Sequence, residues 1–277
     1  MKFVTVANDR HGYLNILEKQ IKKSGNILSI LGVGEKWGGF MWRYILLLKF
    51  LSDLPDEEIV VIMDGYDVLY INPIGLEDKF KSFKTNILYG IDNFHSKSYL
   101  HNLIHRRIFP ISCSQGTKKI DVNAGIYMGY VKYLKIFLTN ICIDNDCNNP
   151  NLDDQKLLAQ KCNSDFFKEN VKFDIDYKIF LNINNSSLFT NKSSFKLTDG
   201  KVIINNNSPN FVHGPGNTNL NFIVKSYGYE EVPQHNINKD RTKYILNGFK
   251  IHYQYFIPDI IVIITIFIVI FICCKIK

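Results

Sequence analysis

The chain has 277 residues, of which 46% are hydrophobic, and carries a formal net charge of +7. This length and composition exclude a protein too short or too polar to bury a core, and favour one large domain or two small ones. Basic residues are scattered rather than gathered in a stripe. We therefore expect no nucleic-acid partner, and interpret the charge as solubility with some attraction to anionic substrates or membranes.

Hydrophobic strands alternate with helical segments from the N-terminus onward. The pattern predicts strands over 3–7, 27–31 and 59–63, and helices over 12–23 and 41–51. A Gly-rich loop, 32–39, separates the second strand from the second helix. This βαβ alternation predicts an α/β fold with a mainly parallel sheet flanked by helices.

An acidic turn follows the third predicted strand, where Asp64-Gly65-Tyr66-Asp67 comes directly after a run of β-branched residues. Open α/β sheets bind ligands at the carboxyl ends of their strands. Two carboxylates at this spacing, with Gly65 freeing the turn, can converge on one hard cation such as Mg²⁺ or Mn²⁺. Such a cation would neutralise a diphosphate. The alternative is that Asp64 and Asp67 only cap a turn.

The middle of the chain continues the same alternation around one long polar segment. We predict a helix over 76–83, strands over 87–91 and 121–129, and a helix over 131–140. The basic segment between residue 93 and residue 119 is too long for an ordinary connection, so we predict a binding loop or lid.

Two further polar features come later. Asp153 and Asp154 open a predicted helix, where carboxylates suit the positive end of the helix dipole, and this is a sufficient structural explanation for them. His213 follows a strand in a turn rich in Gly and Pro, and is either a structural histidine or a metal ligand.

The C-terminal sequence is typical of a membrane anchor. Residues 255–277 are almost free of charge until the final lysines, and a polar, basic linker, 233–254, precedes them. We predict a single transmembrane helix, with a buried core helix as the alternative. The N-terminus offers no secretory signal, so we expect a cytosolic catalytic domain, with lumenal placement left open. In that compartment we expect reduced thiols, with a small loop disulfide between Cys142 and Cys147 as the alternative.

Several blocks, taken together and in order, resemble the glycosyltransferase domain of the procollagen lysyl hydroxylase family and its viral collagen glycosyltransferase relatives. They span about residues 3 to 230. Any one block is weak, whereas the ordered set is specific. The blocks are Thr5-Val6-Ala7, Gly12-Tyr13-Leu14, Leu31 to Gly39, Met63 to Val68, Asn123-Ala124-Gly125, Asp153-Asp154-Gln155 and Val212-His213-Gly214.

The resemblance implies a GT-A fold, a UDP-glucose or UDP-galactose donor and Mn²⁺, with Mg²⁺ as the alternative ion. It implies a collagen-like or other hydroxylated protein as the acceptor. The site residues follow by matching positions. They are Asp64, Asp67 and His213 for the metal; Val6, Ala7, Trp37, Asp64, Tyr66 and Gly214 for the donor, with Tyr66 stacking on uracil; and Asp153 and Asp154 facing the acceptor and the transferred sugar.

The chain departs from the family pattern in places. Gly65 stands where the family usually has serine, and Asn219 where it has a lysine that would contact phosphate. Arg43 or a lysine of the predicted lid would be the substitute. Three hypotheses follow: a hexosyltransferase acting on (galactosyl)hydroxylysine, a non-catalytic membrane-anchored relative that binds UDP-sugars, and a GT-A enzyme acting on glycans or lipids.

Overall fold

The computed structural model describes residues 1–92, 113–183, 195–198, 200–215 and 218–233, with Ile257, Ile261, Ile264 and Thr265. The chain divides into two compact units. The first comprises Met1–Lys97 and Ile111–Pro233, and the second comprises Ser98–Pro110 and Gln234–Lys277. All the helices and strands named below belong to the first unit.

Strands and helices alternate over the first half of this unit, as predicted, and short strands and helices dominate the second half. The strands are β1 (Lys2–Val6), β2 (Leu28–Leu31), β3 (Ile59–Asp64), β4 (Val68–Tyr70), β5 (Ile87–Ile91), β6 (Cys113–Gln115), β7 (Lys118–Ile120), β8 (Val122–Tyr130), β9 (Val171–Phe173), β10 (Phe180–Asn182), β11 (Lys196–Thr198), β12 (Lys201–Ile203) and β13 (Phe211–His213). The helices are α1 (Leu14–Lys23), α2 (Phe40–Ser52), α3 (Leu76–Ser82), α5 (Val131–Asp144), α6 (Asp154–Lys161), α7 (Asp165–Asn170) and α8 (Asn221–Ser226).

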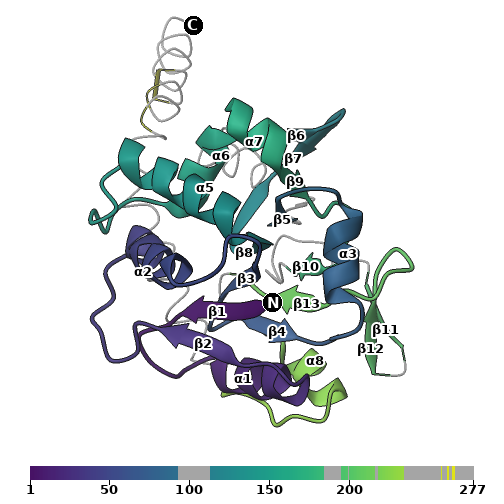
Figure 1. Ribbon diagram of the computed structural model, residues 1–277. Helices are drawn as coiled ribbons and strands as arrows, with labels where there is room; N and C mark the ends of the chain where they lie inside the picture. The colour runs from purple at the N-terminus through teal and green to yellow at the C-terminus, as the bar shows by residue number, and fades with distance from the viewer. Residues whose placement is uncertain are drawn as a thin grey trace, which may run out of the picture. The chain divides into compact units, whose positions relative to one another are not determined.

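Six strands form the central sheet in the order β2-β1-β3-β8-β5-β9 (Figure 1). β1 is parallel to β2 and β3, and β5 is parallel to β9. β8 runs antiparallel to both of its neighbours, β3 and β5. The prediction of an α/β fold with a mixed, mainly parallel sheet is therefore confirmed for the described strands. The sequence did not indicate which strand is reversed, because a strand buried on both faces has the same pattern in either direction.

Helices cover both faces of the central sheet. Alternate residues of β3 point to opposite faces, as the twofold period of a strand requires. Val60 and Ile62 pack with α2 and α5, whereas Val61 and Met63 pack with α1 and α3. This double burial explains why β3 reads as an uninterrupted apolar run up to its final residue, Asp64.

A smaller sheet lies beside the central one in the order β10-β13-β4. β13 is parallel to β10 and antiparallel to β4. This arrangement places His213 next to Asn182 on one side and next to Val68 on the other. Sequence patterning missed β4 and β10, because three-residue strands are too short to display a period.

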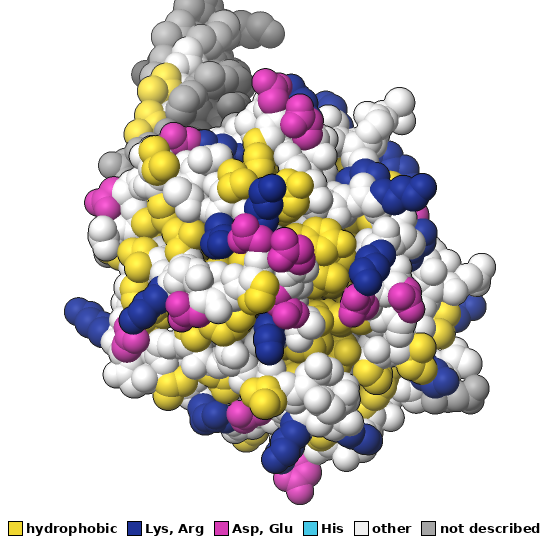
Figure 2. All heavy atoms as spheres, viewed as in Figure 1, with side chains coloured by type: hydrophobic (Ala, Val, Ile, Leu, Met, Phe, Trp, Pro, Cys, Tyr) yellow, Lys and Arg dark blue, Asp and Glu magenta, His cyan; other side chains and the backbone are white. Residues whose placement is uncertain are grey.

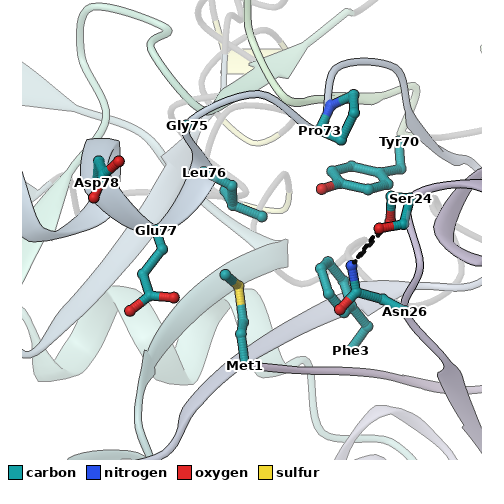
Figure 3. A pocket seen from close by; sticks show the side chains of 10 residues that line it. All are labelled: Met1, Phe3, Ser24, Asn26, Tyr70, Pro73, Gly75, Leu76, Glu77 and Asp78. Carbon is teal, nitrogen blue, oxygen red and sulfur yellow. Dashed lines mark hydrogen bonds between the residues drawn. The ribbon is translucent and has the colours of Figure 1, made fainter.

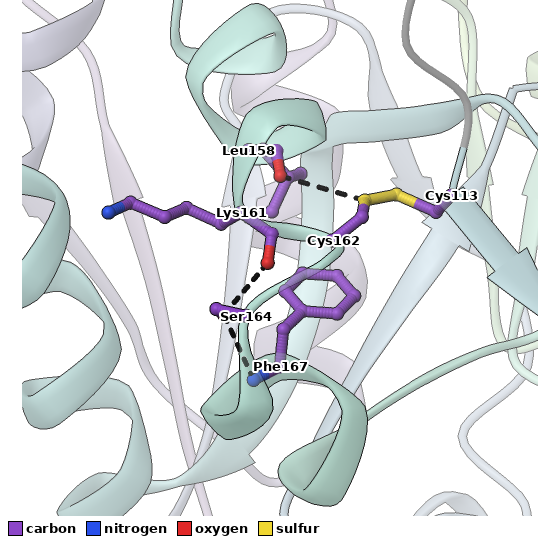
Figure 4. Close-up of a disulfide and its surroundings, with 6 residues drawn as sticks. All are labelled: Cys113, Leu158, Lys161, Cys162, Ser164 and Phe167. Atoms are coloured by element: carbon purple, nitrogen blue, oxygen red, sulfur yellow. Dashed lines mark hydrogen bonds between the residues drawn. A yellow bond between two sulfur atoms is a disulfide. The ribbon is translucent and has the colours of Figure 1, made fainter.

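Two disulfides link elements of the first unit, so the prediction of reduced thiols was wrong for four of the six cysteines. Cys142 pairs with Cys147 at the end of α5. Cys113 of β6 pairs with Cys162, which follows α6 (Figure 4). The second pair spans 49 residues of sequence, so only the packing of the β6–β7 hairpin beside α6 reveals it.

Parts of the predicted organisation lie outside the described residues. Of the predicted lid, residues 93–112 are not described, and most of the remainder forms the β6–β7 hairpin. The predicted linker, 233–254, is undescribed after Pro233, and the predicted anchor, 255–277, is described only at Ile257, Ile261, Ile264 and Thr265. No helix in the described part of the chain has the length and apolar character needed to cross a membrane.

The face seen in Figure 2 carries acidic and basic side chains interspersed over the first unit. Ion pairs at the surface of this unit include Lys81 with Glu77 and Lys135 with Asp56. Such exposed pairs serve solubility more than stability.

Candidate active site

The acidic turn lies where two parallel strands of the central sheet end. Asp64 is the last residue of β3 and pairs in register with Val6, the last residue of β1. The backbone of Tyr66 accepts a hydrogen bond from the amide of Tyr13, 2.8 Å away, which fixes the turn against the start of α1. Gly12 has a φ of +58°, and a Cβ there would lie 2.3 Å from the Tyr66 carbonyl oxygen. The close contact with the acidic turn thus explains why the sequence has glycine at position 12, directly before Tyr13.

His213 reaches the same place from the smaller sheet. β13 brings His213 opposite Val68 of β4, and the amide of Gly214 donates to the carbonyl of Asp67 over 2.8 Å. His213 Nε2 consequently lies 3.4 Å from Asp67 Oδ1 and 3.7 Å from Asp64 Oδ2. One ligand atom from each of these three side chains lies within 4.8 Å of the other two. The three residues predicted to bind a metal therefore converge.

The chemistry of this group fits a divalent cation. His213 is 1% exposed, and neither its Nε2 nor the buried Asp67 Oδ1 has a hydrogen-bond partner among the described residues. Buried polar atoms are normally paired, so two unpaired atoms that face one another indicate a missing partner. Two carboxylates and one imidazole form a donor set that suits Mn²⁺ or Mg²⁺ with water completing the shell.

A buried arginine connects this group to the second acidic motif. Arg43 of α2 is 6% exposed, and its Nη1 lies 2.6 Å from Asp64 Oδ1. Its Nη2 lies 3.9 Å from Asp154 Oδ2. Burial would lower the pKa of Arg43, but the two carboxylates outweigh burial and raise it. Arg43 is therefore a fixed cation between carboxylates from β3 and α6.

Asp153 and Asp154 have different environments although they are adjacent. The carboxylate of Asp153 accepts a hydrogen bond from the amide of Lys156, 3.0 Å away, and caps α6. This is the structural explanation that the sequence offered. Asp154 instead is 5% exposed and turns toward Arg43, and its Oδ2 has no hydrogen-bond partner in the described structure.

Burial also sets the protonation of the site. It raises the pKa of Asp154 to about 6, against the opposing effect of Arg43. It likewise raises the pKa of Asp64 above its usual value, with Arg43 again acting in the opposite direction. Burial lowers the pKa of His213, but Asp67 and Asp64 outweigh it and the net pKa is raised. Perturbed carboxylates and histidines of this kind are typical of functional sites.

Tyr66 projects from the acidic turn toward the loop after β1. Its hydroxyl donates to Asn8 Oδ1 over 2.8 Å and accepts from the Asn8 amide over 3.0 Å. Its ring stacks on His11 with centroids 3.5 Å apart and planes 20° apart. One face of the aromatic ring that was predicted to stack on a base is therefore covered by His11.

The comparisons with known proteins bear on this geometry. Residues 1–231 match the family model of the PLOD GT domain. The chain belongs to the PLOD GT domain family. The family resemblance seen in the ordered sequence blocks is confirmed, and the protein is a member of a family of glycosyltransferase domains. No curated protein matches the chain.

Solved structures similar to this PLOD GT domain include two glycosyltransferases. One is described as a glycosyltransferase involved in the glycosylation of the major capsid of PBCV-1; it is 12% identical, covers 79% of this chain and 96% of its own, and has a TM-score of 0.44. The other is the galactosyltransferase LgtC in complex with donor and acceptor sugar analogues; it is 12% identical, covers 84% of this chain and 98% of its own, and has a TM-score of 0.47.

The remaining predicted donor residues of this PLOD GT domain lie at the end of β1, in the loop between β2 and α2, and directly after β13. Val6 and Ala7 are buried in the two cores that flank the sheet, so their backbone rather than their side chains would face a ligand. Gly214 contributes its amide to Asp67. Trp37, in the loop before α2, is 39% exposed and packs edge-on against Phe40 and Trp42.

Sequence reasoning left two residues of the site without a role. A Cβ on Gly125 of β8 would lie 2.3 Å from His213 Cε1 and 2.6 Å from Asp64 Oδ2, so this strand leaves space for both side chains only because it carries glycine there. Asn182, the last residue of β10, contacts His213 Nδ1. A polar residue that ends the apolar run Ile179-Phe180-Leu181 was the available signal for Asn182.

A separate pocket of this PLOD GT domain, about 440 Å³ in volume, lies at the opposite end of β1 (Figure 3). Met1 and Phe3 line it, together with Tyr70 and the start of α3. Phe3 is three residues before Val6, about 10 Å along an extended strand. The pocket therefore does not include the Asp64, Asp67 and His213 group.

Proposed function

We propose that this chain is a metal-dependent glycosyltransferase that moves glucose or galactose from a UDP-sugar to a hydroxyl acceptor. The observation that carries the proposal is the convergence of Asp64, Asp67 and His213 from two different sheets, with unpaired buried atoms facing one another. Membership of the PLOD GT domain family supports sugar transfer. Mn²⁺ is the ion we propose, with Mg²⁺ as the alternative, and a hydroxylysine of a collagen-like protein, bare or already galactosylated, as the acceptor.

The site supports this chemistry through charge. A cation held by Asp64, Asp67 and His213 would stabilise the negative charge that develops on the departing UDP. Arg43 keeps the carboxylates of Asp64 and Asp154 in place without occupying the buried atoms of Asp67 and His213. Tyr66 offers an aromatic ring at the edge of the site, where a uracil base would displace His11 or stack on the opposite face of the ring.

Asp154 is the better placed of the two adjacent carboxylates to act on the acceptor. Asp153 is committed to the α6 cap, whereas Asp154 Oδ2 has no hydrogen-bond donor among the described residues. With a pKa of about 6, Asp154 is mostly ionised near neutral pH and could accept or orient the proton of a hydroxyl group. We therefore propose Asp154 as the acceptor-side residue and Asp153 as its structural neighbour.

The test is a donor screen with purified protein. We expect UDP release from UDP-glucose or UDP-galactose in the presence of Mn²⁺, slow without acceptor and faster with a hydroxylysine-containing collagen-like peptide. Asp67→Ala and His213→Ala should lower the rate at least ~100-fold, as removal of a charge-stabilising group does. Asp165→Ala is the matched control, because that side chain is 96% exposed on α7. The proposal fails if no UDP-hexose is bound or cleaved and Asp67→Ala changes nothing.

One observation favours a second candidate, a non-catalytic relative that binds UDP-sugars. Asn219 stands where the family has a lysine, and its side chain accepts a hydrogen bond from the amide of Asn221, 2.9 Å away. It is therefore engaged in a local turn. Tight UDP binding without turnover, with turnover gained in Asn219→Lys, would support this candidate. Faster turnover with oligosaccharide or lipid acceptors than with collagen-like peptides would support an enzyme acting on glycans or lipids.

We also propose that residues 255–277 hold the chain at a membrane, on the strength of their apolar sequence. The two disulfides favour a catalytic domain facing an oxidising compartment over the cytosolic placement expected from the sequence. Resistance to extraction by alkaline carbonate, lost on deletion of 255–277, would support the anchor. Release of the intact chain by carbonate would contradict it.

A further inference from the structure

The side chain of Asn182 lies between the metal-binding histidine and the end of β5. Asn182 and His213 are direct neighbours in the parallel pairing of β10 with β13, and each is 1% exposed. Asn182 Oδ1 lies 3.0 Å from His213 Nδ1. Asn182 Nδ2 donates to the carbonyl oxygen of Ile91 over 2.6 Å. The amide therefore has a buried contact at each end.

These two contacts determine which way round the amide lies. The carbonyl oxygen of Ile91 can only accept, so the NH₂ group of Asn182 must face it. The remaining end of the amide, Oδ1, can also only accept, and it faces His213 Nδ1. A hydrogen bond between them requires that His213 Nδ1 carry the proton.

The tautomer of His213 follows from this chain of hydrogen bonds. When the imidazole is neutral and Nδ1 carries its proton, Nε2 has a free lone pair. Nε2 is the atom that points between Asp67 Oδ1 and Asp64 Oδ2. Gly125 of β8 lies beside the ring, and a Cβ there would be 2.3 Å from Cε1, so the imidazole occupies the space that a side chain at this position would take.

We propose that Asn182 is a positioning residue, which holds His213 in the tautomer and orientation whose Nε2 lone pair faces the two carboxylates. Its role in metal binding rests on the proposed function. Asn182 is not one of the three residues proposed to hold the cation, and the effect on metal binding that we assign to it passes through His213. Groups that orient a metal-binding histidine in this way typically change metal affinity or activity about 10- to 100-fold when they are removed.

The first measurement uses the wild-type protein without metal. Long-range ¹H–¹⁵N NMR of ¹⁵N-histidine-labelled protein, assigned with His213→Gln and recorded at alkaline pH where the ring is neutral, reports which ring nitrogen carries the proton. We expect protonated Nδ1 and unprotonated Nε2. A predominant Nε2–H tautomer in the wild type would overturn the proposal without any variant having to fold.

The second measurement compares variants by titration with Mn²⁺ alone. Asn182→Leu removes the polar contacts with His213 and Ile91 at similar volume, and we expect a mixed tautomer population and Mn²⁺ affinity weaker by about 10- to 100-fold. Asn182→Asp keeps an acceptor for Nδ1–H but loses the donor to the carbonyl oxygen of Ile91, so its Mn²⁺ affinity should lie between those of the wild type and Asn182→Leu. Unchanged Mn²⁺ affinity and tautomer in folded Asn182→Leu would overturn the proposal.

Asn210→Leu is the matched control for a purely structural effect. Asn210 is also fully buried, lies just before β13, and donates to the carbonyls of Asn72 and Ile74 without contacting His213. It should lose stability as Asn182→Leu does but keep the His213 tautomer and Mn²⁺ affinity. If the wild type shows the Nδ1–H tautomer yet binds neither Mn²⁺ nor UDP, the proposed function fails while the orientation assigned to Asn182 is supported.

Discussion

The guanidinium of Arg43 contacts the carboxylate of Asp64, with Nη1 2.6 Å from Oδ1. The pair joins the first turns of α2 to the end of β3, and the same guanidinium lies 3.9 Å from Asp154 of α6. One buried cation thus holds two carboxylates that come from distant parts of the sequence. Without it, Asp64 and Asp154 would repel one another in a poorly solvated site.

Replacing Arg43 with methionine should destabilise the fold and reduce catalysis together. Removal of one partner of a buried ion pair lowers the free energy of unfolding by about 3 kcal/mol or more. We expect a loss near about 3 kcal/mol here, because the side chain of Asp64 is 27% exposed and water reaches part of it. Urea unfolding checks the stability. Lys81→Met is the control, because it breaks an exposed pair on α3, where solvent screens the charges, and should leave the free energy of unfolding nearly unchanged. A loss in Arg43→Met no larger than in this control would contradict the role assigned to Arg43.

Gly125→Ala should disrupt the group of metal ligands. The added Cβ would lie 2.3 Å from His213 Cε1 and 2.6 Å from Asp64 Oδ2, so both side chains must move. We expect Mn²⁺ affinity to fall at least ~10-fold in a titration of the folded protein, as displaced ligands imply. Gly129→Ala lies on the same strand and crowds the carbonyl of Asn86 instead. It should cost stability and leave Mn²⁺ affinity of the folded protein unchanged.

Asp154 should make stability depend on pH in a defined direction. Its pKa is about 6 in the folded protein against 3.8 in the reference state, so the folded state holds the proton more tightly. This contribution to stability is fully present below pH 3.8 and is lost as pH rises through about 6. The shift of about two units corresponds to roughly 3 kcal/mol. Urea unfolding of metal-free protein should therefore show the wild type losing stability relative to Asp154→Asn as pH rises from about 4 to about 7. If the free energies of unfolding of the wild type and of Asp154→Asn changed in parallel with pH, this prediction would be contradicted.

The two disulfides should contribute unequally to the stability of the folded protein. Loss of the Cys113–Cys162 link releases a 49-residue loop and should cost about 4 kcal/mol on chain entropy. Loss of the Cys142–Cys147 link releases a five-residue loop and should cost about 2 kcal/mol. Urea unfolding of Cys162→Ser and Cys147→Ser without reductant measures the difference between the two losses of stability. Alkylation of all four cysteines in unreduced, denatured wild-type protein would refute the pairing.

Tyr66 should matter to nucleotide binding through its ring rather than its hydroxyl. Base stacking on an aromatic ring is worth about 1–3 kcal/mol, so Tyr66→Ala should weaken UDP binding by that amount. Tyr66→Phe loses the hydrogen bonds of the hydroxyl with Asn8 and with the amide of Asp9, keeps the ring, and should bind UDP nearly as the wild type does. Calorimetric titration with UDP and Mn²⁺ compares them. Equal affinities in all three proteins would show that the ring is not used.

Several of the predicted site residues could be found from sequence because local chemistry marks them. Asp64 and Asp67 follow an apolar run, and His213 ends a strand before a Gly-rich turn. Carboxylates and imidazoles are unusual at the ends of buried strands, so each stands out against its neighbours. Asp153 and Asp154 were visible too, but their sequence context could not separate the helix cap from the buried carboxylate.

The rest depended on contacts between residues far apart in the chain. Arg43 lies within a largely apolar helix, and nothing in that pattern indicates that Asp64 and Asp154 lie beside it. Asn182 is one of many asparagines in the second half of the chain. Its contact with His213 exists only because β10 and β13 pair in register. Such long-range pairings leave no periodicity in the sequence.

By itself, the sequence determined the α/β alternation, the family and the positions of the three candidate metal ligands, because hydrophobic periodicity and ordered motifs are local properties. The tertiary structure decided how those ligands meet, since His213 lies on β13 of a separate small sheet, where this strand pairs antiparallel with β4. It also decided that Asp153 caps a helix while Asp154 faces Arg43, and that Cys113 pairs with Cys162. These outcomes depend on packing between distant segments, whose geometry is set only when the whole core forms.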